Sequence, residues 1–259
     1  MVKGLYTAYT GMINEQRRMD ALTNNLANVD TTGFKKEGAT SQSFNDILAY
    51  NIKDRSEFYL AKREGVLNPG VRIGETYRDF TVGGLHQTDN TFDLALTDQG
   101  FFRVEFANKE TGEAEVKYTR DGSFTLNEAG ELVTKDGDFV LDADGQHIVL
   151  NPLLDAEINR LGEIHQNDIL VANLGITDFE DYNYLEKYGE NEFVTVEGAT
   201  EQDANTQVLS GYLEQSNVSV VEEMVNMIAV QRQYESNQRM ITTIDSTLQI
   251  AANDLGRLT

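Results

Sequence analysis

Apolar residues recur every seven positions near the start of the chain. One set is Leu5, Met12, Met19 and Leu26, and its companion set is Ala8, Glu15, Leu22 and Val29. Two such sets are the seam positions of a heptad repeat, which buries one stripe of a helix against another helix. Glu15 is the polar exception, and Gly4 and Gly11 each weaken the helix by about 1 kcal/mol relative to Ala. The pattern predicts a heptad helix and an Asn-rich turn over residues 1–34.

The end of the chain carries the same pattern more strongly. One set is Val220, Met227, Tyr234, Ile241, Leu248 and Leu255, and its companion set is Glu223, Val230, Asn237, Ile244, Ala251 and Leu258. Ser219 followed by Glu222 is a capping box that predicts the helix start, and Gly256 is a plausible stop. Residues 211–259 are therefore expected to hold a second heptad helix, about 54 Å long, that packs with residues 1–34.

The heptad pattern alone leaves two interpretations open. The two helices could be core helices of one globular domain, or they could form a terminal coiled coil, within the chain or between subunits. A helix longer than about 25 residues favours the coiled coil.

Between the ends the period changes to short alternating segments, which predicts a β-rich domain over residues 78–210. Turn signals stand at Asn108 to Gly112, Asp121-Gly122, Asn127 to Gly130, Asp136-Gly137 and Asp144-Gly145, and many are spaced as in β-hairpins. The expected core faces carry Phe101, Phe102, Val104, Tyr118, Phe124, Leu126, Leu132, Val133, Phe139, Val140 and Leu141. The DADG of residues 142–145 lacks the further ligands of a calcium loop, so a hairpin turn is expected there.

Two stretches are less regular. Residues 35–77 have mixed character and contain Pro69 and Gly70, which predicts an extended connector. Residues 191–217 are expected to form a strand and a polar linker that returns to the C-terminal helix. The predicted fold class is α+β, with long terminal helices forming a coiled coil and a central β-rich domain.

Charge separates the ends from the middle. The formal net charge is -22, yet residues 1–36 carry +2 and residues 216–259 carry -2, so the β-rich part holds the acidity. Such a surface repels nucleic acid and anionic lipid, so neither is expected as a partner. The chain has no Cys and no apolar run near the ~18 residues of a membrane span. The N-terminal segment also lacks the apolar run of a secretory signal peptide.

No recognisable chemistry emerges from the polar residues. His86, His147 and His165 show no zinc-type pairing, and phosphate-loop, dinucleotide and nucleophile-elbow motifs are missing. We expect no enzyme activity, cofactor or metal. An acidic carbohydrate-active enzyme and a soluble coiled-coil binding or adhesion module are the alternatives from other classes, and the second predicts a stable, discrete oligomer.

Four segments in order resemble the flagellar rod and hook protein family, the axial proteins of the bacterial flagellum. NNLANVDTTGFKK (24–36) is similar to its N-terminal signature, and GYLEQSNVSVVEEMVNMIAVQRQYESNQRMI (211–241) to its C-terminal signature. TDNTFDLALTDQGFFRV (88–104) and YTRDGSFTLNEAGELVT (118–134) are similar to its central β-domain motifs. Asp98 stands where the family often has Gly. Gly takes a positive φ more easily than Asp, so the shape of that loop is left open.

The resemblance implies a structural, non-enzymatic component of the basal-body rod, outside the cytoplasmic membrane. Such proteins are exported unfolded by the flagellar type III apparatus and polymerise with themselves and with other rod and hook proteins. Their terminal helices pair as an antiparallel coiled coil lining the inner tube. Ring or bushing proteins would be further partners in a host with an outer membrane. Length and the C-terminal segment resemble the distal rod class most, with a proximal rod or hook-like paralogue as the alternative.

Two short motifs are singled out within this resemblance. Asn24, Asn25 and Asn28 are expected to bond loose backbone groups, of this chain or of a neighbouring subunit, where the inner helix ends. Gly33 is expected to permit a turn before Phe34. Phe44 and Leu48 fit a short export motif, for which the alternative is a buried pair one helical turn apart.

Overall fold

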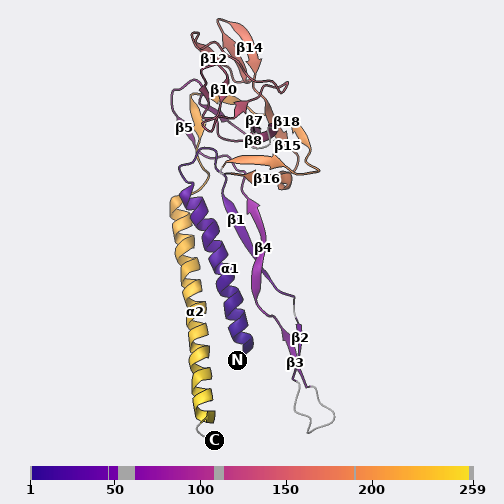
Figure 1. Cartoon of the computed structure of the whole chain (residues 1–259), viewed down its shortest axis with the longest axis vertical. Helices are drawn as coiled ribbons and strands as arrows, with labels where there is room; N and C mark the ends of the chain where they lie inside the picture. Colours follow the sequence, from indigo (N-terminus) through magenta and orange to yellow (C-terminus); the bar gives the residue numbers. More distant parts are fainter. Residues whose placement is uncertain (1, 46, 52–61, 108–113, 190, 257–259) are drawn as a thin grey trace. The chain divides into compact units, whose positions relative to one another are not determined.

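The chain forms two compact units, each assembled from segments that are far apart in the sequence. The computed structural model describes residues 2–45, 47–51, 62–107, 114–189 and 191–256. Unit 1 holds the segments up to Leu26, Glu37–Arg78 and from Ser219 onward. Unit 2 holds Ala27–Lys36 and Asp79–Val218. Helices and strands segregate along the chain, which confirms the predicted α+β class (Figure 1).

Two helices dominate unit 1. They are α1 (Val2–Ala27) and α2 (Val220–Gly256). The start of α2 lies where it was predicted, because Ser219 directly precedes the helix and its carbonyl accepts a hydrogen bond from the Glu223 amide at 3.0 Å. Glu222 and Glu223 lie in the first turn, where negative charge is favoured by the helix dipole. Val29, expected on the first seam, lies beyond the end of α1 in the turn that follows.

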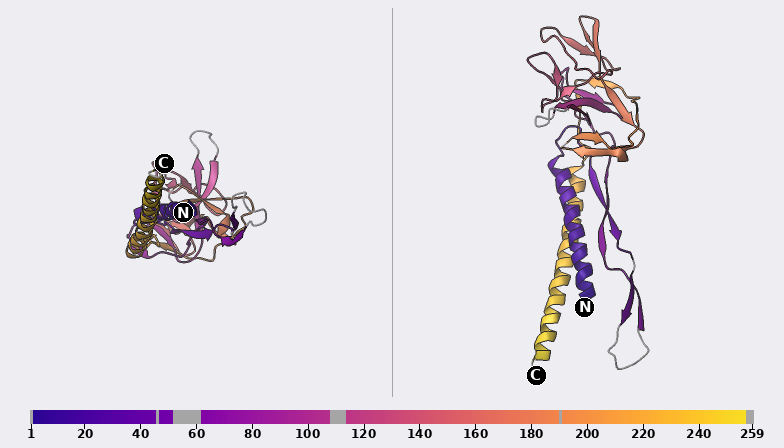
Figure 2. Two further views of the ribbon diagram at one scale, coloured as in Figure 1. Left: turned by 90° about the horizontal axis from the view of Figure 1, so that it is seen from below. Right: turned by 45° about the vertical axis from the view of Figure 1, so that its right-hand side comes forward.

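The helices α1 and α2 lie side by side and antiparallel (Figures 1 and 2). A Cβ on Gly4 would lie 3.7 Å from Ile244 Cδ1, and one on Gly11 would lie 3.0 Å from Asn237 Nδ2. Near the other end of α1, Asn25 bonds Glu223 at 3.2 Å. Each step along α1 is matched by an equal step back along α2, so one constant register runs along the pair.

The remainder of unit 1 is a ribbon of antiparallel strands. It consists of β1 (Glu37–Ser43) paired with β4 (Val71–Arg78) and β2 (Ile47–Asn51) paired with β3 (Lys62–Leu67). The segment expected as an extended connector therefore makes regular strand pairs. Phe44 lies between β1 and β2, and Leu48 lies within β2, so the alternative interpretation of a helical turn between them is wrong.

The ribbon approaches the face of α1 that is turned away from α2 (Figure 2). Gly70 has a φ of 138°, and any Cβ there would collide with the Thr10 hydroxyl. Asn14 donates from Nδ2 to Ser41 Oγ at 2.9 Å. Because Thr10 and Asn14 are both buried, α1 is covered on two sides.

Unit 2 is built from strands and one short 3-10 helix. They are β5 (Leu85–Gln87), β6 (Leu94–Leu96), β7 (Phe101–Ala107), β8 (Ala114–Thr119), β9 (Thr125–Leu126), β10 (Leu132–Val133), β11 (Phe139–Val140), β12 (Ala156–Ile158), β13 (Glu163–Gln166), β14 (Ile169–Asn173), β15 (Ile176–Phe179), η1 (Tyr182–Tyr184), β16 (Leu185–Tyr188), β17 (Glu192–Thr195), β18 (Glu201–Asp203), β19 (Val208–Ser210) and β20 (Tyr212–Glu214). Among the described residues the main sheet runs β16-β17-β8-β7-β11-β10-β9, with β15 joining β7 and β18 joining β15. Smaller sheets are β12-β13-β14, β19-β6 and β20-β5.

Neighbouring side chains on β7 belong to two different hydrophobic cores. Phe102 and Val104 belong to a large cluster with Leu94, Leu132 and Ile164. Phe101 belongs to an aromatic cluster that contains Tyr118, Phe179, Leu185 and Phe193. Successive residues of a strand point to opposite faces, so the two cores lie on opposite faces of β7. Of the predicted core residues, Leu126 and Phe139 are half-buried and the others are buried.

Most predicted turns within unit 2 are confirmed. Gly130, Gly137 and Gly145 have positive φ and close the turns after β9, after β10 and between Leu141 and His147. The turn signal at Asp121-Gly122 does not mark a hairpin, because β8 and β9 pair with other strands and the Gly122 carbonyl accepts from the Leu94 amide. The signal from Asn108 to Gly112 lies outside the described residues.

Two boundaries differ from those expected. Residues 27–34 and 211–218 belong to unit 2, although they were expected to go with the terminal helices, and so do residues 35–36 from the expected connector. Asp98 has no positive φ, so the residue that departs from the family pattern does not strain its loop. In the part of the chain that is described, no helix has both the length and the apolar character needed to cross a membrane.

The turn after α1 depends on Gly33, as predicted. Its φ is 68°. A Cβ there would lie 2.5 Å from the carbonyl carbon of Arg120 and 2.5 Å from the amide nitrogen of Asp121, which are backbone atoms. Gly33 also donates its amide to the Glu214 carbonyl at 2.9 Å. The residue is thus restricted both by its backbone angle and by the absence of space.

We expect Gly33→Ala to destabilise unit 2 by more than about 2 kcal/mol, because the new methyl group strains the backbone angle and displaces the backbone at Arg120 and Asp121. Gly189 is the matched control, since its φ is 67° but nothing lies within 4 Å of its Cβ position. Gly189→Ala should cost only about 1 kcal/mol, from the backbone angle alone. Urea unfolding followed by tyrosine near-ultraviolet dichroism measures both, and equal losses would contradict the steric argument.

Candidate assembly site

The least exposed positions of α2 follow the predicted seam. Proceeding from the N-terminal end, they are Glu223, Met227, Val230, Tyr234, Asn237, Ile241, Ile244, Leu248 and Ala251. Their spacing alternates between four and three residues, which is the heptad pattern. Val220 is 39% exposed at the start of the helix, and the side chain of Leu255 lies outside the described part. Glu223 and Asn237 are thus part of the seam although they are polar.

On α1 the predicted positions are covered to different degrees. Ala8 and the polar exception Glu15 are buried. The predicted residues Leu5, Met12, Met19, Leu22 and Leu26 are half-buried. Gly4, Gly11 and Asn25 meet α2 directly. The pairing of α1 with α2 therefore includes small and polar residues between the larger apolar ones.

Glu15 is held by polar neighbours on both helices. Arg18 donates to its Oε2 at 3.1 Å, and Asn14 donates to its Oε1 at 3.3 Å. The Gln233 carboxamide faces it from α2 and, with its nitrogen turned toward Glu15, donates to both oxygens at 3.3 Å. A buried charge needs such partners, and specific partners fix the register of a helix pair.

Asn25 is the residue at which three elements of unit 1 meet. Its side-chain amide donates to the Glu37 carbonyl at 2.8 Å and accepts from the Glu37 amide at 2.9 Å. These two bonds satisfy the backbone carbonyl and amide of the first residue of β1, as a neighbouring strand would. The same Nδ2 also donates to Glu223 Oε2 at 3.2 Å, in the first turn of α2. Asn25 is fully buried, so all of these bonds are shielded from water.

The other residues of the Asn-rich turn have different roles. Asn24 donates to Glu37 Oε2 at 3.5 Å. Asn28 follows α1, and its side-chain oxygen accepts from the Thr31 hydroxyl at 3.2 Å. Phe34 is buried in unit 2, with the Lys187 ammonium 4.7 Å from its ring centre. The expectation that the Asn residues bond backbone groups is met within the chain by Asn25.

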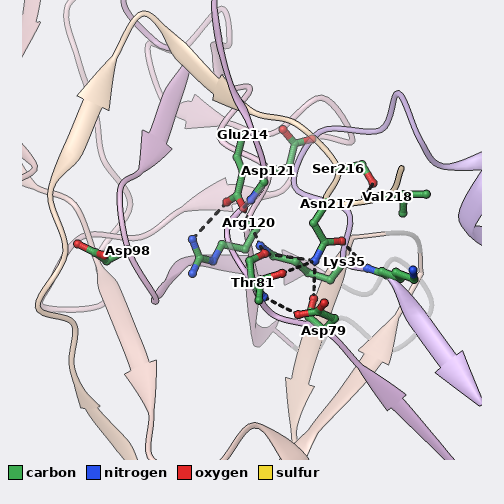
Figure 3. A network of polar contacts seen from close by, with 12 residues as sticks. Lys35, Asp79, Thr81, Asp98, Arg120, Asp121, Glu214, Ser216, Asn217 and Val218 are labelled. Atoms are coloured by element: carbon green, nitrogen blue, oxygen red, sulfur yellow. Dashed lines mark hydrogen bonds and ion pairs between the residues drawn. The ribbon is translucent and has the colours of Figure 1, made fainter. Parts of the chain in front are cut away.

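Glu214 lies at the centre of a buried ion cluster in unit 2 (Figure 3). Lys35 donates from Nζ to its Oε1 at 2.6 Å, and Arg120 donates from Nη1 to its Oε2 at 3.2 Å. The Gly83 amide donates to Oε1 at 2.9 Å. All three charged side chains have exposed fractions of 1%. Burial lowers the pKa of Lys35, and the Glu214 carboxylate opposes that shift.

Asn217 extends the cluster through hydrogen bonds from its side chain to neighbouring backbone groups (Figure 3). Its Oδ1 accepts from the Lys36 amide at 2.8 Å, and its Nδ2 donates to the Asp79 carbonyl at 2.8 Å. Lys35 Nζ also donates to the Thr81 carbonyl at 2.8 Å. These residues flank the positions where the chain passes between the units, at 36–37, 78–79 and 218–219. The cluster therefore holds the unit 2 side of three of the four crossings, and the crossing at 26–27 lies outside it.

The three histidines do not form a metal site. His147 stacks on Phe139 with ring centres 4.4 Å apart, and its Nε2 lies 3.4 Å from Glu105 Oε1. His86 and His165 lie on β5 and β13. Within the described residues, no group of three or more His, Asp or Glu is placed to hold a metal ion. The buried polar residues instead join segments that are far apart in the sequence, such as Asn25 with Glu223 and Lys35 with Glu214.

Comparisons with known proteins agree with this geometry. Residues 5–35 match the family described as "Flagella basal body rod protein", and residues 209–255 match "Flagellar basal body rod FlgEFG protein C-terminal". Residues 95–171 match "Flagellar hook protein FlgE/F/G D1 domain". The flagellar basal-body rod protein FlgG of Buchnera aphidicola subsp. Acyrthosiphon pisum is 34% identical, over 96% of this chain and 98% of its own length. The chain belongs to the flagellar rod and hook protein family.

Other relatives extend over the full length as well. FlgG of Bacillus subtilis is 34% identical, over 98% of this chain and 99% of its own. The basal-body rod protein FlgF of Caulobacter vibrioides is 32% identical, over 100% of this chain and 98% of its own. The protein is therefore a structural component of the flagellar basal-body rod.

The ion cluster was not predicted, yet each of its charged residues lies in a segment that resembles the rod and hook family. Lys35 lies in NNLANVDTTGFKK, Arg120 in YTRDGSFTLNEAGELVT and Glu214 at the start of the C-terminal signature. The structure brings these three segments together at one carboxylate. The available signal was an unexplained charge inside each motif, but no spacing rule links residues so far apart.

We expect Glu214→Gln to destabilise unit 2 by about 3–5 kcal/mol, because it leaves two buried cations without their counter-charge. The matched control is Glu235→Gln, which removes the partner of Arg239 in an exposed pair on α2 and should cost less than about 0.5 kcal/mol. Urea unfolding of the intact chain tests this, and a loss below 1 kcal/mol for Glu214→Gln would contradict the role given to the cluster.

Asn25→Asp should loosen unit 1 although it preserves the shape of the side chain. The new carboxylate faces the Glu37 carbonyl and the Glu223 carboxylate and cannot donate to either, at a cost of about 2–4 kcal/mol. Asn28→Asp is the control, because it keeps the oxygen that accepts from the Thr31 hydroxyl. Amide hydrogen exchange of α1 should accelerate in the first variant alone, and unchanged protection of α1 in Asn25→Asp would contradict this assignment.

Proposed function

We propose that the protein assembles into the rod by polymerising through its terminal helices, which pair as an antiparallel coiled coil. The single observation that carries this proposal is the constant antiparallel register between α1 and α2, with heptad spacing along α2. A pair with one register is a rigid rod-like element that can be repeated along a helical assembly. The seam comprises the predicted residues from Leu5 to Leu26 on α1 and from Val220 to Leu255 on α2.

We also propose the wider role that belongs to such an assembly. The chain is exported unfolded by the flagellar type III apparatus and joins other rod and hook proteins, with ring or bushing proteins around it in a host that has an outer membrane. The relatives named FlgG support a place in the distal rod, and the relative named FlgF keeps a proximal place as the alternative. A motif of Phe44 and Leu48 acts during export. The half-buried ring of Phe44 outside any helix supports a role separate from core packing.

We expect Ile241→Asp to abolish assembly, because a charge in the seam against α1 is costly unless it is paired. Thr242→Asp is the control, since Thr242 follows Ile241 in the sequence but its side chain is exposed and lies outside the seam. Basal bodies purified from cells that express each variant show which one is incorporated. Incorporation of Ile241→Asp would contradict the seam, and a discrete soluble oligomer of the unmodified chain would favour a binding module instead.

Phe44→Ala should slow export and leave the stability of unit 2 unchanged, because Phe44 belongs to unit 1. Secretion into the medium of a strain that lacks the hook measures export, and urea unfolding measures stability. Normal secretion of the variant would contradict the export motif.

A further inference from the structure

A groove runs along α1 on its side toward the ribbon. It has a volume of about 240 Å³. Its α1 wall presents Tyr6, Tyr9, Ile13 and Arg17, and its ribbon wall presents Phe44 and Ile73. The spacing of the α1 residues places them on one face of the helix over three turns. Figure 2 shows α1 and the ribbon side by side along this length.

The chemistry of the groove is that of a protein-binding site. Tyr6 and Tyr9 are 52% and 48% exposed, although their rings are large and apolar. Arg17 and Arg72 line it and, among the described residues, no carboxylate does, in a chain with a net charge of -22. Tyr and Arg are the side chains most enriched at energetic centres of interfaces.

The floor of the groove also contains an unsatisfied acceptor. Asn14 lines the groove and is 2% exposed. Its Nδ2 donates to Ser41 and Glu15, but its Oδ1 is buried and accepts no hydrogen bond from the residues that the structure describes. A buried acceptor without a donor is costly, so this position favours an occupant that supplies one.

A matching surface lies on α2. Val221, Met224, Val225 and Ile228 are exposed by 74%, 50%, 60% and 49%. They occupy positions i, i+3, i+4 and i+7, which is the anchor pattern of a helix that docks into an apolar groove. The segment from Ser219 to Val230 has two Glu and neither Lys nor Arg. Its charge is therefore complementary to that of the groove.

The groove of one chain cannot be filled by α2 of the same chain. The exposed anchors lie outside the set of seam positions that face α1. The constant register also places Glu223 opposite Asn25, at the far end of α1 from Tyr6 and Tyr9. Only a second copy can bring Val221–Ile228 to the groove.

We infer that the first two turns of α2 from one copy dock into the groove between α1 and the ribbon of a second copy. The inference rests on the proposed function and names the surfaces through which it operates. Donor and acceptor surfaces differ, so a docked pair still offers a free groove on one copy and a free stripe on the other. Such a head-to-tail contact propagates and does not close on itself as a two-fold dimer does.

Disulfide cross-linking tests the contact directly, because the full-length chain contains no Cys. We expect a mixture of Tyr9→Cys and Val225→Cys chains to give disulfide-linked dimers under mild oxidation, and neither variant to give them alone. The control mixture is Tyr9→Cys with Gln249→Cys, which carries an exposed thiol on α2 outside the anchor segment. The state of the same samples is followed by light scattering and electron microscopy.

A second variant separates docking from folding. Ile228→Asp places a charge in the docked stripe but points away from α1, so the monomer should keep its helix content. It should slow polymerisation at least about tenfold, because the charge would have to be desolvated in the groove. Met240→Asp is the matched control, an equally exposed apolar residue of α2 outside the anchors.

The outcomes separate this inference from the proposed function. Cross-links confined to the Tyr9 and Val225 mixture, with loss of polymer only in Ile228→Asp, would support it. Polymers that form without that cross-link, or that are lost equally in Ile228→Asp and Met240→Asp, would overturn the docking site and leave assembly through the terminal helices standing. The absence of both polymer and cross-link from concentrated chain would overturn both.

Discussion

A single buried carboxylate organises the part of the chain that joins the two units. The side chain and carbonyl of Glu214 are contacted by Gly33, Lys35, Gly83 and Arg120, which come from separate stretches of the sequence. None of the three charged groups could remain buried without the others, because the desolvation cost of each is offset only by its partners. The positions of Gly33, of the strand β20 and of the segment after β4 all follow from that requirement.

In unit 1 the central element is α1, which contacts both α2 and the ribbon. One face of α1 meets α2 through Gly11, Glu15 and Asn25. The other face meets the ribbon through Thr10 and Asn14. A helix that is covered on two sides does not show the single apolar stripe of a surface helix. The polar residues Asn14 and Asn25 are buried on α1 with hydrogen bonds to Ser41, Glu37 and Glu223. On α2, by contrast, burial is confined to the heptad positions of a single face.

What could be predicted from the sequence was local. The heptad spacing of α2, the start of that helix at Ser219 and the glycine turns of unit 2 follow from rules that act over a few residues. The path of the chain around Asp121-Gly122 was missed, because the Leu94 amide that captures the Gly122 carbonyl is not signalled by any neighbouring residue. The ribbon was recognised only as extended, since its strands have exposed polar residues and no clear alternation. The partners of Glu214 could not be predicted, because a single charged residue in a motif does not indicate which distant charged residue it contacts.

The distances in sequence across these contacts have a kinetic consequence. Lys35 and Glu214 are separated by 179 positions, and Asn25 and Glu223 by 198, in a chain of 259 residues. Contacts of such long range form slowly, because the intervening chain must be closed before they can contribute. While the last fifth of the polypeptide is still missing, neither unit can be completed, because unit 1 lacks α2 and unit 2 lacks Glu214. The C-terminal stretch therefore supplies the last contacts of both units, so that the two are completed together when the end of the chain becomes available.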